Sequence, residues 1–469
     1  MDKKEKQPVF SLWRLLRLSS FQIGSAMGDI IVTSIWNRVM ISQFGIPAAP
    51  VSLLIALRYL LSPLSLWAGY RSDTRPFLGL RRSSYIWLGR GLMVLSLPLL
   101  GWSLTRFAAA SAASAAGGGG EAMGWLLAVL SSLLYGVGTL ISGSPYLALV
   151  RDSAPRERQG LAISLAETVL IICFAIVGIA FSFWMREFDP VIFWEMVIAT
   201  MIIGGFFWLF SIWGVEQSIR KEKGMTLAQE LASVHKRAAQ SSLADTLKRI
   251  WLDARTRRFF IFLSLATFSA WTQDAILEPF GAEVFHLPLD RTTRFNSYWQ
   301  AATVLTLVGG AFLWRKRPPE KQRGITVGGL LVMALGMLLL AGTAVFQQVH
   351  LVEVALLLFG AGFGVYTFGG LSLMAVMSSD QEAGAYLGLW TISVVVFKGI
   401  GTFAGGTLRD LFLLGMQLNS GVGYGLVFFL AALGLGTAVV LLLRVDVLGF
   451  ALEMGRLLSR AEVQIASAD

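Results

Sequence analysis

Residues 69–82, Gly69-Tyr-Arg-Ser-Asp-Thr-Arg-Pro-Phe-Leu-Gly-Leu-Arg-Arg82, separate two long apolar stretches of this chain. The stretch before them, 50–70, and the stretch after them, 85–104, are each long enough to cross a bilayer as a helix. A short basic segment between two such stretches is typical of a turn between neighbouring membrane helices. This loop therefore indicates a membrane protein whose helices follow one another through the bilayer.

The composition of the whole chain agrees with this interpretation. The chain has 469 residues, of which 55% are hydrophobic and 14% charged, whereas soluble proteins carry about 25% charged residues. Twelve apolar segments long enough to span a bilayer can be marked: 21–43, 50–70, 85–104, 124–150, 161–184, 191–214, 259–280, 297–314, 325–345, 351–375, 385–412 and 422–443. The sequence thus predicts an all-α polytopic membrane protein with twelve transmembrane helices.

Lysine and arginine predict the orientation of these helices. Of 39 such residues, 30 lie in the loops and tails of one side, and four lie on the other side: Arg106, Arg186, Arg291 and Arg294. Basic residues concentrate on the cytoplasmic side of membrane proteins, so both termini are expected in the cytoplasm. The net charge of +10 is then explained by loops that touch anionic lipid, and no nucleic-acid partner is expected.

The longest polar stretch divides the chain into two sets of six predicted helices. The predicted parts are a cytoplasmic tail 1–20, a six-helix bundle 21–214, a cytoplasmic linker 215–258, a second bundle 259–443 and a cytoplasmic tail 444–469. In the linker, Leu243, Leu247, Ile250 and Trp251 predict an amphipathic helix at the inner headgroups. A similar surface helix is expected at 12–18.

Glycines at the ends of predicted helices suggest that the two halves are repeats. Gly69 and Gly310 lie before the loops after spans two and eight, while Gly160 and Gly384 end the turns after spans four and ten. An insert rich in alanine, glycine and serine at 108–120 explains most of the difference in spacing. Two similar six-helix halves are typical of a duplicated transporter fold.

The motif Gly69-x-x-x-Asp73, followed by Arg81-Arg82, resembles the loop signature of the major facilitator superfamily. In that motif Gly69 would let two helices approach closely. Asp73 would cap a helix or form an ion pair at the inner gate, and the two arginines would face anionic lipid. The resemblance implies the major facilitator superfamily fold with two six-helix halves. Trp314 stands where the second half would carry the aspartate, so a gating ion pair is not expected there.

Longer strings resemble one family of that superfamily, the PucC/LhaA or bacteriochlorophyll-delivery family. The strings are NRVM at 37–40, FGIPA at 44–48, YRSDT at 70–74, RRSSYIW at 81–87, LALVRD at 147–152, QDAILEPFG at 273–281 and GAYLGLW at 384–390. The resemblance runs from residue 14 to residue 443, and QDAILEPFG is its most specific piece. The length of the chain and its core-antenna-like sequence pattern resemble the LhaA branch more than the PucC branch.

This resemblance implies an assembly factor for light-harvesting antenna complexes in the inner, intracytoplasmic membrane of a photosynthetic bacterium. The implied partners are antenna polypeptides, the reaction centre and pigment-synthesis enzymes, and the implied cofactor is bacteriochlorophyll, bound transiently. One alternative is a secondary transporter that moves a small solute or a chlorin by proton-coupled alternating access. Another is a permanent subunit of a photosynthetic complex. The sequence has no metal-spaced Cys/His cluster, phosphate loop or nucleophile elbow, so neither enzymatic activity nor a catalytic metal is expected.

Polar residues inside the predicted helices are candidates for binding a pigment or a substrate. A charged residue at the centre of a membrane helix costs about 2.5–3.5 kcal/mol on insertion scales, so such residues are retained for a reason. The candidates are Asp29, Arg58, Gln273, Asp274, Glu278, His286 and Lys398. The alternative interpretation is that these charges form ion pairs that fix helix packing, for instance a carboxylate with Arg58 or Lys398.

The QDAILEPFG string carries the most specific of these hypotheses. Asp274 and Glu278 are four residues apart, so they are expected to share a helical face. Pro279 has no N–H to donate, so it frees a carbonyl one turn earlier, close to both carboxylates. None of the three histidines lies at the bilayer midplane, so a central histidine-ligated pigment is not expected and His286 remains a candidate for an outer one. Arg38 is expected to snorkel at a helix end.

Overall fold

The computed structural model describes residues 10–112, 119–155, 158–224, 226–229, 251–314, 322–378 and 383–453. Within these ranges the chain is helical, and no strand is present. Nine helical segments of the described residues are long and apolar enough to cross a membrane. The predicted all-α membrane fold is therefore confirmed. The predicted amphipathic helix of the linker lies almost wholly outside the described residues.

Predicted spans one and seven are helical but interrupted. Span one is α2 (Phe21–Ile30), followed by the π-helical turns η1 (Ile31–Trp36) and η2 (Val39–Gln43). Span seven consists of α13 (Ala254–Trp271) and α14 (Leu277–Phe285). Such π-helical turns are rare and occur often at functional sites, which makes span one relevant to the candidate site. Span seven is interrupted by a turn at 272–276.

Predicted span eight forms one unbroken helix, α15 (Leu289–Trp314). Its first turns carry Asp290, Arg291 and Arg294, so the polar part of this helix is longer than the sequence prediction of 297–314 allowed. This explains why α15 does not stand out by hydropathy although it has the length of a membrane helix.

Packing divides the chain into two compact units. The first unit is Met1–Gln240 with Gln273–Gln300 and Thr402–Ser420, and the second is Ser241–Thr272 with Ala301–Gly401 and Gly421–Asp469. Two parts of the second predicted bundle thus pack within the first unit. The predicted division of the sequence into two six-helix bundles stays a prediction.

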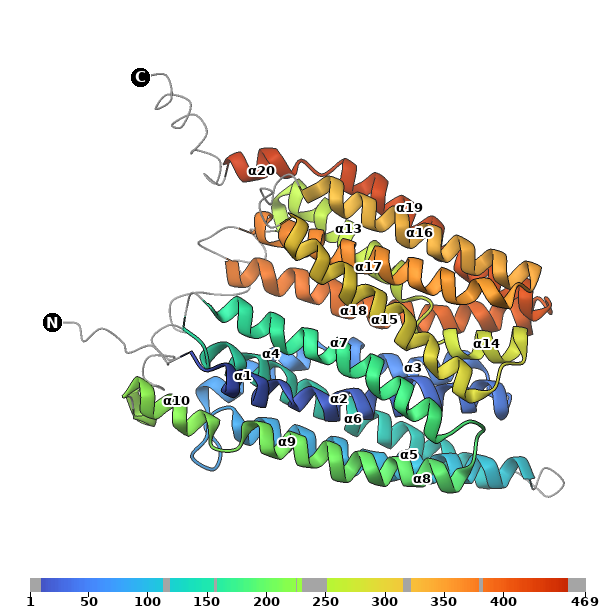
Figure 1. Ribbon diagram of the computed structural model, residues 1–469, viewed down its shortest axis with the longest axis horizontal. Helices are drawn as coiled ribbons and strands as arrows, with labels where there is room; N and C mark the ends of the chain where they lie inside the picture. The colour runs from blue at the N-terminus through green and yellow to red at the C-terminus, as the bar shows by residue number, and fades with distance from the viewer. Residues whose placement is uncertain are drawn as a thin grey trace. The chain divides into compact units, whose positions relative to one another are not determined.

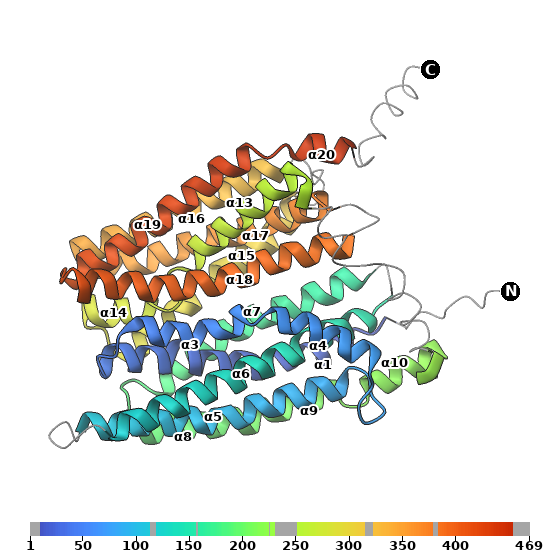
Figure 2. The same cartoon turned by 180° about the vertical axis from the view of Figure 1, so that it is seen from behind.

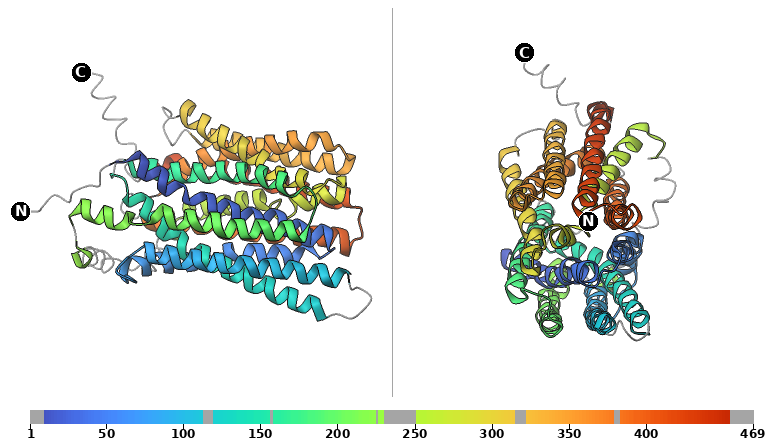
Figure 3. Two further views of the ribbon diagram at one scale, coloured as in Figure 1. Left: turned by 60° about the horizontal axis from the view of Figure 1, so that its bottom comes forward. Right: turned by 90° about the vertical axis from the view of Figure 1, so that its right-hand side faces the viewer.

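The first unit contains most of the described helices, which run nearly parallel (Figures 1 and 3). Besides the elements above, its helices are α1 (Leu12–Ser19), α3 (Ala48–Leu60), α4 (Pro63–Thr74), α5 (Ser83–Ala112), α6 (Gly119–Asp152), α7 (Gln159–Trp184), α8 (Pro190–Ala199), η4 (Thr200–Gly204), α9 (Gly205–Ile212), α10 (Val215–Lys223) and η7 (Leu411–Gly415). Helices α5 and α6 lie side by side along their lengths (Figure 2). They approach so closely at Gly89 that a Cβ atom there would lie 2.4 Å from the carbonyl oxygen of Gly138.

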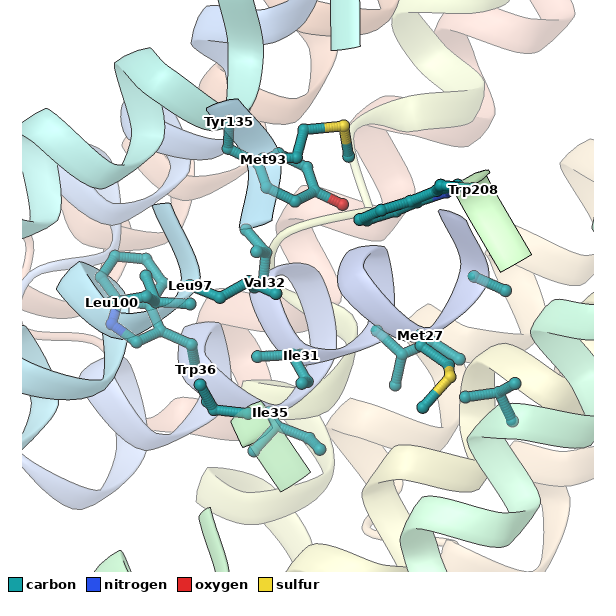
Figure 4. Close-up of a cluster of buried hydrophobic side chains, with 14 of the residues drawn as sticks. Met27, Ile31, Val32, Ile35, Trp36, Met93, Leu97, Leu100, Tyr135 and Trp208 are labelled. Carbon is teal, nitrogen blue, oxygen red and sulfur yellow. The ribbon is translucent and has the colours of Figure 1, made fainter. Parts of the chain in front are cut away.

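The core of the first unit surrounds α2 and η1. Trp36 is fully buried beside Leu97 and Leu100 of α5 (Figure 4), and its Nε1 donates a hydrogen bond of 3.3 Å to the hydroxyl of Ser103. Tyr135 of α6 lies beside Met93 at another part of the same cluster. Apolar packing around the Trp36 indole and the Tyr135 phenol therefore fixes the positions of the indole N–H and the phenol hydroxyl.

The second unit contains α13, the first part of α18 (Ala383–Asp410) and the helices α16 (Arg323–Phe346), η6 (Val349–Leu351), α17 (Val352–Val376), α19 (Ser420–Leu443) and α20 (Val447–Glu453). Helices α16 and α17 pack along their lengths as α5 and α6 do (Figure 1). A Cβ atom on Gly362 would lie 2.4 Å from the backbone nitrogen of Met333. The same kind of glycine-mediated pair therefore occurs in both predicted halves, in agreement with an internal repeat.

The predicted helix at 12–18 is present as α1, and only part of its surface is exposed. Leu12 and Trp13 are exposed, whereas Leu15 and Leu18 are buried against the first unit. Arg17 donates hydrogen bonds to the backbone carbonyls of Phe210 and Trp213. Helix α1 is thus attached to the end of α9, and the contact of its exposed apolar residues with headgroups stays a prediction.

The predicted orientation leads to a direct test with reporter fusions. A fusion at Gly118 is expected to report the outer side, and a fusion at Glu230 the cytoplasmic side, because 30 basic residues lie on the predicted inner side against four outside. Alkaline phosphatase and green fluorescent protein, which are active on opposite sides, provide the measurement. Reports from the same side at both positions would contradict the twelve-helix topology.

Candidate functional site

The signature loop forms a charged cluster that we call the loop cluster, made of Asp73, Arg81, Arg82, Asp152 and Glu216. Arg81 Nη2 lies 3.0 Å and Arg82 Nε 3.2 Å from Asp73 Oδ1. Arg82 also donates to a carboxylate oxygen of Asp152 and, over 2.6 Å, to the carbonyl of Ala148. The loop thereby ties the end of α4 to the end of α6.

Glu216 completes the loop cluster and was not recognised in the sequence. Its carboxylate accepts the backbone N–H groups of Arg81, Arg82 and Ser83, over 2.6, 3.1 and 2.8 Å, and so caps the N-terminus of α5. Arg220 lies one turn further along α10 and pairs with it at 3.0 Å. No residue spacing in the linker signals this contact, because it joins segments more than 100 residues apart.

The two arginines of the loop do not face lipid, so that expectation was wrong. Arg81 and Arg82 are each only 5% exposed and are held by carboxylates. Burial alone would lower the pKa of Arg82, but the carboxylates of Asp152 and Asp73 outweigh burial and raise it. Asp73 forms the ion pairs that the motif implies, and a role in gating stays a prediction.

Asp29 and Arg58 form an ion pair inside the first unit. Asp29 Oδ1 also accepts the hydroxyl of Tyr135 over 2.6 Å, and Arg58 Nη2 donates to the hydroxyl of Tyr59 over 2.6 Å. Arg58 is 8% exposed and the Asp29 side chain 23% exposed. These four side chains, the Asp29 cluster, join α2, α3 and α6.

The Asp29 cluster agrees with the interpretation that intramembrane charges fix helix packing. Gly28 and Gly136 lie against it, and a Cβ atom at Gly28 would be 2.8 Å from the Tyr135 hydroxyl. The partial exposure of Asp29 shows that one side of the pair is open. The pair therefore joins α2 to α3, and part of the Asp29 side chain stays exposed.

The QDAILEPFG string forms a turn and a short helix. Residues 272–276 make the turn between α13 and α14, so Asp274 and Glu278 do not share a helical face as expected. The carbonyl of Ala275, four residues before Pro279, accepts Asn37 Nδ2 over 2.7 Å. This carbonyl is free because α14 begins at Leu277, and Pro279 lies in the first turn of α14, where no N–H is needed, so the effect predicted for the proline is not what frees it.

Glu278 is fully buried in a group of polar side chains. Asn296 of α15 donates both to Glu278 Oε1 and, over 2.8 Å, to the hydroxyl of Ser34, and its own oxygen accepts Trp299 Nε1 over 2.8 Å. Asp274 is separate from this group and accepts the hydroxyl of Thr402 over 3.2 Å. We call Ser34, Asn37, Glu278 and Asn296 the Glu278 cluster, and Gln273, which is buried in the turn before α14, is the neighbouring candidate in the sequence.

Other candidates lie outside this cluster. Lys398 Nζ lies 3.3 Å from the centroid of the Trp271 ring in the second unit. His286 is exposed at the end of α14 with φ +53°. Arg38 is 8% exposed and donates to the carbonyl of Leu287 over 2.9 Å, so it does not snorkel as expected.

Comparison with known proteins identifies the family. A family profile described as "PUCC protein" matches residues 35–450. The chain belongs to the PucC family. It is 27% identical to "Protein PucC" of Rhodovulum sulfidophilum over 85% of each chain. It is 24% identical to the "Bacteriochlorophyll synthase 44.5 kDa chain" of Rhodobacter capsulatus, over 91% of this chain and 95% of the relative.

Solved transporters share the fold of this family member. A mutant of the peptide transporter POT in complex with sulfate has a TM-score of 0.63 and covers 96% of this chain and 97% of its own. Its sequence identity is 15%, so this likeness shows the fold alone. The fold is that of the major facilitator superfamily, as the loop motif predicted.

Two strings that resemble the PucC family in the sequence contact each other in the structure. NRVM at 37–40 supplies Asn37, and QDAILEPFG supplies the carbonyl that Asn37 binds. Bacteriochlorophyll would need an axial ligand for its magnesium, and His286 is too exposed to provide an enclosed one. The geometry at His286 therefore does not fit a buried pigment site.

Proposed function

We propose that this protein is an assembly factor for bacterial light-harvesting antenna complexes. The observation that carries the proposal is the family match over residues 35–450, which includes the whole loop cluster and most of the other two clusters. In this proposal the chain binds antenna polypeptides, passes bacteriochlorophyll to them and catalyses no reaction. It acts in a photosynthetic bacterial membrane with both termini in the cytoplasm.

The packing of the charged residues supports a scaffold. Asp29 pairs with Arg58, Glu283 pairs with Arg409, and Asp410 accepts the backbone N–H groups that begin α3. Such pairs hold helices together. Exposed apolar side chains from η4 to the end of α9, such as Ile202, Phe206 and Trp213, offer a surface to lipid and to membrane-embedded partners.

Secondary transport is the second candidate function, and two observations favour it. The solved structures with this fold are transporters. Asp29 is 23% exposed although it lies inside a predicted membrane helix, as a carboxylate beside a water-filled path would be.

Purification from native membranes separates these functions. We expect antenna polypeptides to copurify in mild detergent in less than equal amounts, with bacteriochlorophyll absorbance that follows the protein through size exclusion. The measurements are mass spectrometry of the copurified proteins and absorbance of the bound pigment. The double variant Asp73→Asn, Arg81→Gln, which loosens the loop cluster, is purified in the same way. Preparations free of antenna polypeptides and pigment, with uptake of a solute into proteoliposomes, would instead establish transport. A constant one-to-one ratio in mature complexes would indicate a permanent subunit.

A further inference from the structure

Three buried oxygen atoms, two in the Glu278 cluster and one on Gln273 in the turn before α14, have no hydrogen-bond partner in the described residues. They are Asn37 Oδ1, Gln273 Oε1 and Glu278 Oε2. Their side chains are 0%, 2% and 0% exposed. A buried polar oxygen without a partner destabilises the folded state, and an unpaired buried charge does so more strongly. Three such atoms on segments joined by the Asn37–Ala275 hydrogen bond therefore require an explanation.

The three oxygens come from segments that contact each other. Asn37 binds the carbonyl of Ala275, which lies two residues after Gln273 and three before Glu278. Asn296 bridges Ser34 to Glu278, so η1 and α15 meet α14 at the same place. All three unpartnered atoms are acceptors. A group that donates a hydrogen bond would therefore satisfy any of them.

We propose that Glu278 binds a proton in this conformation, and that release of the proton is coupled to separation of η1–η2 from the turn 272–276 and α14. A protonated carboxyl has an O–H that can donate to an amide oxygen, whereas a carboxylate adds a further acceptor and an uncompensated charge. The ligand of the site is therefore the hydrogen ion. The proposal goes beyond antenna assembly and holds for a scaffold and a transporter alike.

Charged groups of both signs act on Glu278. Arg38, on the segment between η1 and η2, donates to Leu287 and forms no ion pair with Glu278 among the described residues, although its positive charge favours the carboxylate. Asp274 on the turn disfavours a second negative charge, and the full burial of Glu278, which is the largest effect, favours the neutral carboxyl. Glu283, further along α14, pairs with Arg409 and serves as an ionised reference on the same helix.

Infrared difference spectroscopy on the purified full-length protein tests whether Glu278 carries the proton. The wild type is expected to show the carbonyl band of a buried protonated carboxylic acid, which disappears at alkaline pH. Glu278→Gln should lose this band and Glu283→Gln should keep it. A band that survives in Glu278→Gln, or a wild type without any such band, would overturn the proposal. The wild-type titration is decisive even when a variant does not fold.

Thiol labelling tests the coupling to movement. Cys173 is the one cysteine of the chain, so Cys173→Ala provides a background without cysteine for Ala275→Cys. Ala275 is 1% exposed at the contact with Asn37. Labelling, normalised to the unfolded protein at each pH, is expected to accelerate with rising pH and to stay slow when Glu278→Gln is added. Equal acceleration in both would show that Glu278 does not control the contact. Neither readout uses antenna assembly, so the proposed function is judged separately.

Discussion

Arg58→Met is expected to lower the free energy of unfolding by about 3 kcal/mol, the lower end of the range for breaking a buried ion pair. The substitution leaves the Asp29 carboxylate with the Tyr135 hydroxyl as its remaining hydrogen-bond donor among the described residues. Its cost stays at the lower end because the Asp29 side chain is 23% exposed and keeps some hydration. Unfolding in mixed micelles, followed by the fluorescence of the 15 tryptophans, measures the change.

A double substitution separates charge from packing at this site. Asp29→Asn combined with Arg58→Met removes both charges and keeps most of the volume, so most of the lost stability should return. If the double variant is as unstable as Arg58→Met, packing and not the unpaired charge explains the loss. If Arg58→Met is as stable as wild type, the pair contributes nothing to the joint between α2 and α3.

The membrane fold was predictable from the sequence because it depends on properties that accumulate over many residues. Twenty apolar residues in a row and the bias of lysine and arginine to one side each leave a signal that does not need three-dimensional contacts. The interruptions were not predictable in the same way. Span one contains π-helical turns at 31–36 and 39–43, and nothing in its hydropathy distinguishes them from α-helix.

The candidate site was predictable only in part. Asp29 and Arg58 were found because charge is rare in membrane helices, whereas the break of span seven at 272–276, which leaves the Ala275 carbonyl free, was not predicted. The side chain that binds this carbonyl, Asn37, is uncharged and lies 238 residues away, so no local signal connects the two. Likewise, Glu216 caps α5 across 133 residues of sequence from Ser83. Contacts of this kind appear only once the chain has folded.

Gly89→Val is expected to destabilise the first unit by about 3 kcal/mol, the upper part of the usual range for overpacking. A Cβ atom at this position would lie 2.4 Å from the Gly138 carbonyl oxygen and 2.9 Å from the Ser142 backbone nitrogen. Both atoms belong to the backbone of α6 and cannot rotate away as a side chain would. The two helices must therefore separate, and membrane helices that pack through small residues lose their contact when this happens.

Gly91→Val on the same helix is the matched control. No atom lies within 4 Å of a Cβ atom built on Gly91, so the same change in size and helix propensity meets open space there. We expect Gly91→Val to insert and unfold like wild type, while Gly89→Val gives less folded protein and unfolds at lower denaturant in the same micelles. If both variants are as stable as wild type, α5 and α6 do not touch at Gly89. Equal loss in both would assign the effect to valine in α5, because propensity and not the helix contact would then decide the outcome.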